Sequence, residues 1–255
     1  MSAGTTADKI AAAERAIAEN PVWYHTLELA PGVVTPGQAD DRRLAPKILP
    51  DQLRGLRALD IGTFDGFWAF EMEKRGAEVV AIDLESVEAA DWPPANRDRL
   101  AREAEQFGIE LGRGFRLAKR LLNSEVDHVI CSILDLTPER IGGEVDFIFQ
   151  GALLLHLRDP VGALERARRT LRPGGRMLIW EPISMLDTLR APRRPLARLS
   201  PLLSKFTWWL PNYAALMTMV RAAGFTEVKR LGVHRTGPTR RKRAWFCALE
   251  ARAGA

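Results

Sequence analysis

From residue 53 onward, two hydrophobic patterns alternate along the chain. Short continuous apolar runs, such as "EVVAID" and "VDFIFQ", predict buried β-strands. Between them lie segments whose apolar positions recur every three or four residues, as expected of amphipathic helices. We expect strands near residues 56–61, 78–83, 127–133, 145–150, 175–181, 226–233 and 244–251, and helices near 65–75, 97–107, 113–123, 159–171 and 212–223.

This alternation predicts an α/β fold, in which a mostly parallel seven-stranded sheet is covered by helices on both faces. Residues 1–52 do not follow the pattern: a helix near 7–18 is expected to precede an irregular segment rich in proline and glycine, which we interpret as a flap over the active site. Residues 53–255 form the main domain, and residues 182–211, rich in Arg, Leu, Pro and Trp, interrupt it as a cap insertion.

Composition adds few constraints to this picture. With 46% hydrophobic and 27% charged residues, the chain has an ordinary globular composition, and no apolar run approaches the roughly 18 to 20 residues of a membrane-spanning helix. We therefore expect a cytoplasmic protein that does not enter the membrane. Two cysteines are too few for a disulfide scaffold or a zinc cluster, and no His and carboxylate spacing is typical of a metal site. The net charge of +5 permits a nucleic-acid partner without requiring one.

The turn after the first predicted strand, Gly62-Thr63-Phe64-Asp65-Gly66, lies where doubly wound sheets bind their ligands. Phe64 replaces the central glycine of a dinucleotide fingerprint, and no Gly-Lys-Ser/Thr follows as in a phosphate-binding loop. Asp60 and Asp65 would repel a pyrophosphate but attract an ammonium group. Asp83, at the end of the second predicted strand, is placed to accept the hydroxyls of a ribose. A nucleoside joined to an amino acid satisfies both ends.

The stretch "LDIGTFDGFWAFEMEKRGA" and the acid after the second strand resemble motifs I and II of class I S-adenosylmethionine-dependent methyltransferases. Together with "WYHTLELAPGVVTPG", they are most similar to a subgroup described as tRNA (5-methoxyuridine) methyltransferases, some of which bind carboxy-S-adenosylmethionine. The resemblance implies a Rossmann-like sheet whose last strand is antiparallel. It also implies S-adenosylmethionine, or its carboxy form, as cofactor.

The same resemblance implies which residues contact the cofactor. "CSILDL" would place Asp135 on the adenine amino group, and "VDFIFQGALLLHLRDP" would place Gln150 and Gly151 beneath the sulfonium. Three acids have simpler alternatives: Asp65 as a helix cap, Asp83 as a strand-end acid, and Asp135 as a turn acid. The full set of expected cofactor-binding residues is Asp60, Gly62, Thr63, Phe64, Asp65, Gly66, Asp83, Leu84, Leu134, Asp135, Gln150 and Gly151.

Methyl transfer mainly requires alignment of the reacting atoms, because the sulfonium is already a good leaving group. A hydroxyl acceptor benefits from a base, and His156 is the best candidate, although its apolar neighbours also suit a structural role in the wall. His25 in the flap, with Trp208 and Trp209 in the insertion, is expected to bind the acceptor.

Three functions remain open from the sequence. The leading hypothesis is methylation of a hydroxyl on a small molecule, such as a secondary metabolite or a sugar. The alternative is modification of the wobble uridine of tRNA, suggested by the subgroup, by Arg193, Arg194 and Arg198, and by the cations of residues 235–243, which also suit a solvated hairpin tip. The third is a non-catalytic scaffold that binds the cofactor, because Phe64 replaces a small residue.

Overall fold

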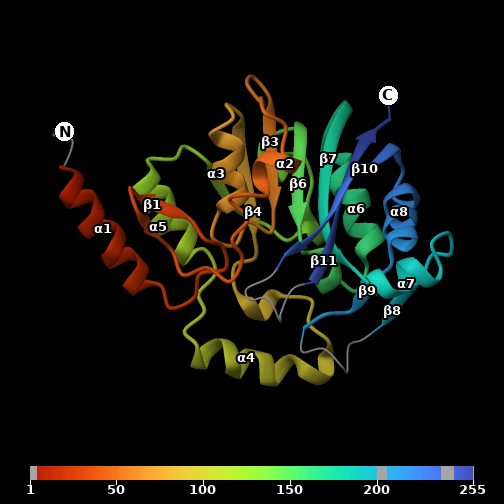
Figure 1. Ribbon diagram of the computed structural model, residues 1–255, viewed down its shortest axis with the longest axis horizontal. Helices are drawn as coiled ribbons and strands as arrows, with labels where there is room; N and C mark the ends of the chain where they lie inside the picture. The colour runs from red at the N-terminus through yellow and green to blue at the C-terminus, as the bar shows by residue number, and fades with distance from the viewer. Residues whose placement is uncertain (1–4, 200–205, 237–243, 255) are drawn as a thin grey trace.

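A seven-stranded sheet forms the centre of the computed structural model, which describes residues 5–199, 206–236 and 244–254 (Figure 1). The strand order is β10-β11-β7-β6-β3-β4-β5, and only β11 runs antiparallel to its neighbours. This confirms the expected Rossmann-like fold class and the antiparallel last strand. The strands are β3 (Arg57–Ile61), β4 (Glu78–Asp83), β5 (Asp127–Ile130), β6 (Val145–Gly151), β7 (Leu171–Ile183), β10 (Phe225–Thr236) and β11 (Ala244–Ala253).

Helices cover both faces of the sheet because successive strand residues point to opposite sides. In β6, Phe147 and Phe149 join one hydrophobic cluster and Ile148 joins the other. The first cluster includes residues of α1 (Thr6–Glu19), α2 (Ala45–Ile48), α3 (Phe67–Glu73) and α5 (Arg113–Leu122). The second includes residues of α6 (Pro160–Arg169) and α8 (Tyr213–Ala222), whereas α4 (Arg97–Gln106) lies below the sheet in Figure 1.

Differences from the expected elements occur at their ends and in short segments. α3 begins at Phe67 instead of residue 65, because the turn continues to Gly66, which has φ of 89°. Four strands were not expected, since two or three residues are too short to show a hydrophobic period: β1 (Glu28–Ala30), β2 (Val33–Val34), β8 (Ala197–Leu199) and β9 (Trp209–Pro211). The remaining short elements are α7 (Met185–Arg190), η1 (Val87–Ala89), η2 (Pro94–Asn96), η3 (Ile133–Asp135), η4 (Glu139–Ile141) and η5 (Leu154–His156).

The N-terminal segment packs on the same hydrophobic cluster as the sheet, to which Trp23, Leu27 and Leu49 contribute. Two of its stretches run side by side: Thr26 N donates to Ala39 O at 2.8 Å, and the Thr35 hydroxyl donates to His25 O at 2.7 Å. These bonds give the segment a defined position over the carboxyl ends of the strands.

Two polar residues, Asn212 and Asp187, organise the described part of the insertion at residues 182–211. The Asn212 side chain, fully buried, accepts a hydrogen bond from Leu196 N and donates one to Arg194 O. Arg198 makes two bonds of 2.6 Å to Asp187 and, with Ser184, lowers the pKa of that carboxyl to about 2. Arg198, expected as an RNA contact, is therefore engaged in an ion pair within the insertion. None of the helices in the described part of the chain is long and apolar enough to cross a membrane.

Candidate active site

The turn between β3 and α3 has an unusual backbone that is tied to the end of β4. Gly62 has φ of 74°, and Phe64, a bulky residue, has φ of 51° in the left-handed region. Phe64 N donates to Asp83 Oδ2 at 2.7 Å, and Gly62 N donates to Ile82 O at 2.9 Å. A left-handed conformation of this kind costs about 1–3 kcal/mol and tends to occur at functional sites.

Asp83 lies at the end of β4 beside an apolar slot of 70 Å³. Oδ2 of Asp83 accepts the bond from Phe64 N, and Oδ1 accepts a hydrogen bond from Leu84 N at 2.7 Å. Burial raises the pKa of this carboxyl. Each carboxylate oxygen retains a further lone pair, so both can still accept ribose hydroxyls. The slot is formed at the ends of β3, β4 and β5 by Ile61, Gly62, Ile82, Asp83, Leu84, Ala89, Asp91, Cys131, Ser132, Ile133, Leu134, Leu153 and Leu157.

Asp60 provides a second acid at the end of β3, and it is 2% exposed. Its Oδ2 has no hydrogen-bond partner among the residues that the structure describes, and burial raises its pKa to about 7. Buried carboxylates normally have partners. An unpaired oxygen at the edge of a cavity is therefore suited to an incoming ammonium group, as the amino-acid part of S-adenosylmethionine would supply.

The slot adjoins a larger cavity of 530 Å³, and the two share Ile61, Gly62, Asp83 and Leu153. Aromatic rings form much of the larger cavity's wall. Trp68 stacks on Phe149 with ring centroids 4.2 Å apart, and Trp180 stacks on Phe246 at 5.0 Å. Such a wall is suited to a flat or apolar acceptor.

The flap contributes His25, which is 5% exposed and lines the larger cavity. Its Nδ1 lies 2.6 Å from Asp65 Oδ1, while Asp65 Oδ2 accepts the backbone N–H groups of Tyr24 and His25 at 2.8 and 2.7 Å. Burial disfavours a charged imidazole, but the charge of Asp65 and its hydrogen bond outweigh this effect, so the pKa of His25 is raised. Asp65 does not cap α3, because the N-cap residue is Gly66 and the carboxylate of Asp65 is bonded to the flap.

His156 lies in η5, past the end of β6, and lines the larger cavity. Its Nδ1 is 2.9 Å from the carbonyl oxygen of Phe206. A carbonyl can only accept, so Nδ1 carries the proton and Nε2 keeps a free lone pair. Burial lowers the pKa of His156. The residue is therefore a neutral imidazole that is able to accept a proton.

Glu181, near the end of β7, is a functional candidate that the sequence analysis missed. One of its oxygens accepts hydrogen bonds from Gln150 Nε2 at 2.5 Å and from Leu153 N and Leu154 N at 2.7 Å. It is 2% exposed, and burial raises its pKa to about 7. Glu181 thus fixes the turn that carries His156. The available signal was a lone acid inside the apolar run "MLIWEPI".

The expected site residues fall into three groups. Asp60, Gly62, Phe64, Asp83, Gly151, His25 and His156 line the larger cavity, and Leu84 and Leu134 line the slot. Thr63, Asp65, Gly66 and Gln150 line neither and support the site from behind.

Three further expected contacts also line neither cavity. Asp135 is exposed at the end of η3, beyond the residues that line the slot. The indole N–H groups of Trp208 and Trp209 donate to the carbonyls of Asp91 and Arg158, and neither residue lines the larger cavity. Phe206 takes the position in the wall that the insertion was expected to fill with tryptophan.

Neither cavity offers a metal site in the described ranges, where no group of three or more His, Cys, Asp or Glu side chains is arranged to hold a metal ion. Both cysteines, Cys131 and Cys247, are buried free thiols.

Comparison with known families finds that residues 38–229 match the family model described as "Methyltransferase domain". Curated relatives include tRNA U34 carboxymethyltransferases from Azotobacter vinelandii, 29% identical over 75% of this chain and 51% of that protein, and from Geobacter sp. (strain M21), 25% identical over 82% and 56%. The chain spans about half the length of the curated relatives it matches.

Solved structures show the same fold. The N-terminal domain of EvdMO1, determined in the presence of SAH and D-fucose, aligns over 98% of this chain and 100% of that chain with a TM-score of 0.61 at 16% identity. The YcgJ protein from Bacillus subtilis aligns over 85% and 100% with a TM-score of 0.54 at 13% identity.

Proposed function

The chain belongs to the S-adenosylmethionine-dependent methyltransferase family, and from this premise we propose that it methylates a hydroxyl oxygen with His156 as general base. One observation carries the proposal: Nδ1 of His156 is bonded to the carbonyl of Phe206, Nε2 has no hydrogen-bond partner in the described part of the chain, and the residue lines the larger cavity, which we call the acceptor cavity. General base catalysis of this kind contributes about 10²–10⁴-fold.

The cofactor supplies a methyl group on a sulfonium leaving group. Asp83 is placed to hold the ribose, and Asp60 is placed to hold the ammonium group. The turn from Gly151 to Leu155, fixed by Glu181, presents the acceptor to the methyl carbon. Nε2 of His156 would accept the hydroxyl proton as the oxygen–carbon bond forms and the carbon–sulfur bond breaks, which would leave the sulfur as a neutral thioether. The aromatic wall keeps water from competing for the methyl group.

The names of the relatives favour uridine 34 of tRNA as acceptor at least as well as a small molecule, which revises the order expected from sequence. A nucleobase turned out of its stack is read by aromatic side chains and hydrogen bonds in a confined pocket. The stacked pairs around the larger cavity offer this kind of surface. A free small-molecule acceptor remains the second candidate, because a cavity of 530 Å³ is a typical size for such ligands.

The role of His156 is tested by His156→Asn, which keeps a donor for the Phe206 carbonyl but removes the base. We expect single-turnover methyl transfer to fall about 10²-fold or more, with unchanged affinity for S-adenosylmethionine in calorimetry. The parent rate should rise with pH up to a pKa below the usual imidazole value and then level off, because the neutral form is the active one. His128→Asn, which removes an imidazole from β5, serves as control. If His156→Asn and His128→Asn transferred the methyl group at equal rates, His156 would not be the base.

The acceptor is identified by incubating the protein and labelled S-adenosylmethionine with tRNA and with a small-metabolite fraction in separate reactions. Label in position 34 of tRNA supports the first candidate, and label only in the metabolite fraction supports the second. Tight cofactor binding with label in neither would contradict both and favour the non-catalytic scaffold.

A further inference from the structure

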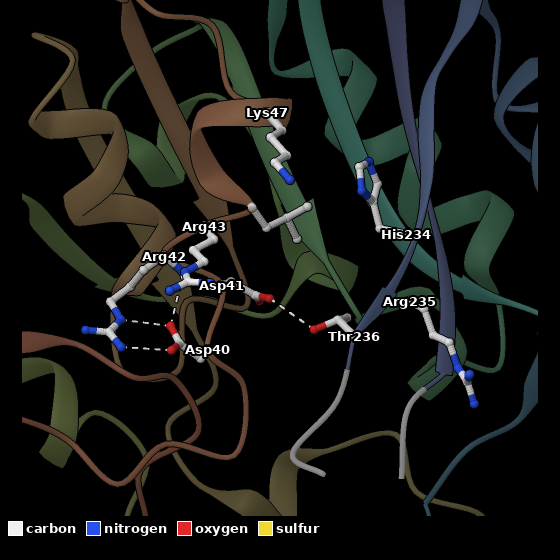
Figure 2. A pocket seen from close by; sticks show the side chains of 9 residues that line it. Asp40, Asp41, Arg42, Arg43, Lys47, His234, Arg235 and Thr236 are labelled. Carbon is white, nitrogen blue, oxygen red and sulfur yellow. Dashed lines mark hydrogen bonds and ion pairs between the residues drawn. The ribbon is translucent and has the colours of Figure 1, made fainter. Parts of the chain in front are cut away.

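Another hollow, of 680 Å³, lies beside the acceptor cavity of 530 Å³, between residues 40–47 of the flap and the end of β10 (Figure 2). We refer to it as the basic groove. Arginine and lysine side chains supply four of its nine lining residues, which are Asp40, Asp41, Arg42, Arg43, Leu44, Lys47, His234, Arg235 and Thr236.

The groove retains positive charge after its internal ion pairs are counted. The guanidinium of Arg42 neutralises the charge of Asp40, because it donates two hydrogen bonds of 2.8 Å to that carboxylate. Arg43 and Lys47 are exposed, and no carboxylate in the described part of the chain pairs with either of them. Figure 2 shows Lys47 on the flap wall of the groove and the His234 ring on the β10 wall, both in the upper part of the view. The charges available to an incoming anion are therefore those of Arg43 and Lys47, on one short stretch of chain, and that of Arg235, whose guanidinium lies 5.8 Å from the ring centroid of Trp245.

Asp41 and Thr236 form the boundary between the basic groove and the acceptor cavity, because both residues line both spaces. The Thr236 hydroxyl donates to Asp41 Oδ1 at 3.4 Å, which closes the boundary with a single long bond. Asp41 is 4% exposed, and its burial raises the pKa of the carboxyl. An acceptor whose reactive group lies near His156 can extend past this boundary into the groove.

We propose that the basic groove binds a phosphate group carried by the methyl acceptor, with Arg43 and Lys47 as its charge partners. This inference rests on the proposed function, since it takes the acceptor to occupy the adjoining cavity. Arginine recognises phosphate through paired N–H donors, and lysine adds a compact charge. The phosphodiester of an RNA next to the modified nucleotide and the phosphomonoester of a small molecule share this chemistry.

Binding is measured first without cofactor or acceptor, with inorganic phosphate as probe and the His234 ring as reporter in an NMR titration. The pKa of His234 is lowered by burial and by the charge of Lys47. A phosphate beside Lys47 should raise it, because an anion favours the charged imidazole. The charged groups around the groove that contribute to this titration are Asp40, Asp41, Arg42, Arg43, Lys47 and Arg235.

The test compares Arg43→Ala/Lys47→Ala with Lys9→Ala/Arg54→Ala, which removes the same charge from exposed positions outside the groove. We expect phosphate to raise the pKa of His234 in the parent and in the control, and to leave it unchanged in the groove variant. An equal response in the groove variant would overturn the proposal. Cofactor affinity, measured by calorimetry, should be the same in all three proteins, which shows that the fold is intact.

Methyl transfer then separates this proposal from the proposed function. With an accepted substrate, the groove variant should raise KM about 10-fold or more with little change in kcat, as expected for loss of charged hydrogen bonds made equally in ground and transition states. An unchanged KM would refute the groove's role while leaving methyl transfer intact. Failure of His156→Asn to slow transfer would refute the base while leaving phosphate binding intact.

The source of the phosphate follows from two further measurements. A phosphodiester of tRNA predicts a steep fall of affinity with salt and resistance to phosphatase. A phosphomonoester predicts that phosphatase treatment of the acceptor raises KM in the parent to the level of the groove variant. An acceptor that is fully active, but whose affinity does not depend on salt and whose KM does not change on phosphatase treatment, would contradict the proposal.

Discussion

At the residue scale, Asp65 links two parts of the site that are distant in the sequence. It follows the cofactor turn, but its carboxylate binds the backbone and the ring of His25 in the flap. Removing one partner of a buried charged pair leaves the other uncompensated, which typically costs about 3–5 kcal/mol. The turn and the flap should therefore lose stability together when this acid is neutralised.

We expect Asp65→Asn to lower the free energy of unfolding by about 3 kcal/mol at pH 6. The pKa of His25 is raised in the folded state, so the stability it adds is complete below the ordinary imidazole pKa and is lost as pH rises through the folded value. The difference between parent and variant should therefore shrink towards high pH. Urea unfolding across pH measures this, with Asp40→Asn, an exposed flap acid, as control. A constant difference would argue against a charged His25.

Glu181 should have the opposite pH dependence. Its folded pKa of about 7 lies above the ordinary glutamate value of 4.5, so ionisation is less favourable in the folded protein and the parent loses stability as pH rises between these values. Glu181→Gln keeps an oxygen acceptor for Leu153 N and Leu154 N but removes the ionisation. We expect the two proteins to be equally stable near pH 4 and the variant to be more stable by about 3 kcal/mol at pH 8. Chemical unfolding at both pH values is the measurement, and a less stable variant at pH 8 would contradict the expectation.

The sequence predicted that Gly62 and Asp83 lie close together, and the structure places both in the wall of one cavity. Gly62 lies in the turn that follows β3, and Asp83 is the last residue of β4. Because the two strands are neighbours, the hydrophobic pattern alone places these residues together. Glu181 and Asp41 could not be placed in this way, since one is an acid within an apolar strand and the other lies in an irregular segment. Their positions depend on which strands are neighbours and on how the flap folds back.

At the element scale, the central strands β3, β4 and β6 were predictable because each is a continuous apolar run that is buried on both faces, whereas the edge strands β5 and β10 are largely exposed. The structure adds details that depend on tertiary contacts. β7 begins at Leu171, four residues before the expected strand, because Leu171 pairs with Val145 of β6 ahead of a register shift, whereas its pairing with β11 covers only Arg176 to Ile183. The insertion contains β8 and β9, whose three-residue strands pair only with each other. The cations of residues 237–243 lie outside the described residues.

The close packing of the flap predicts an effect of adding one methyl group to it. A Cβ at Gly37 would lie 2.1 Å from the backbone carbonyl carbon of His25, and backbone cannot move aside as a flexible side chain can. We expect Gly37→Ala to displace the flap, to cost about 1–3 kcal/mol of stability and to weaken S-adenosylmethionine binding about 10-fold or more. Calorimetry and thermal unfolding are the measurements. Gly254→Ala, where φ is not positive and a Cβ would meet only Thr226 Cγ2 at 3.8 Å, is the control, and equal cofactor affinity in both variants would show that the flap does not shape the site.

At the scale of the whole molecule, the acceptor cavity is assembled from segments that span most of the chain. The flap, the turn before α3, the ends of β6 and β7, and the hairpin of β10 and β11 all contribute to its wall. Three carboxyl groups, those of Asp41, Asp60 and Asp83, belong to this wall. No lysine or arginine lines it within residues 5–199, 206–236 and 244–254. The wall is therefore suited to the positive charge of a sulfonium and an ammonium group.

This charge pattern predicts which methyl donor the protein prefers. Carboxy-S-adenosylmethionine adds a carboxylate on the transferred carbon, and two like charges about 6 Å apart repel by about 3 kcal/mol at an effective dielectric constant of 20. Because burial raises the pKa of both Asp60 and Asp83, part of that repulsion is relieved by protonation. We therefore expect S-adenosylmethionine to bind about 10-fold more tightly than its carboxy form at pH 8, and the preference to narrow at pH 6, where protonation of the wall is greater. Calorimetry with both cofactors at the two pH values is the measurement, and Asp60→Asn should reduce the preference at pH 8. Tighter binding of carboxy-S-adenosylmethionine by the parent would contradict the expectation and would support the carboxymethyl transfer for which the relatives are named.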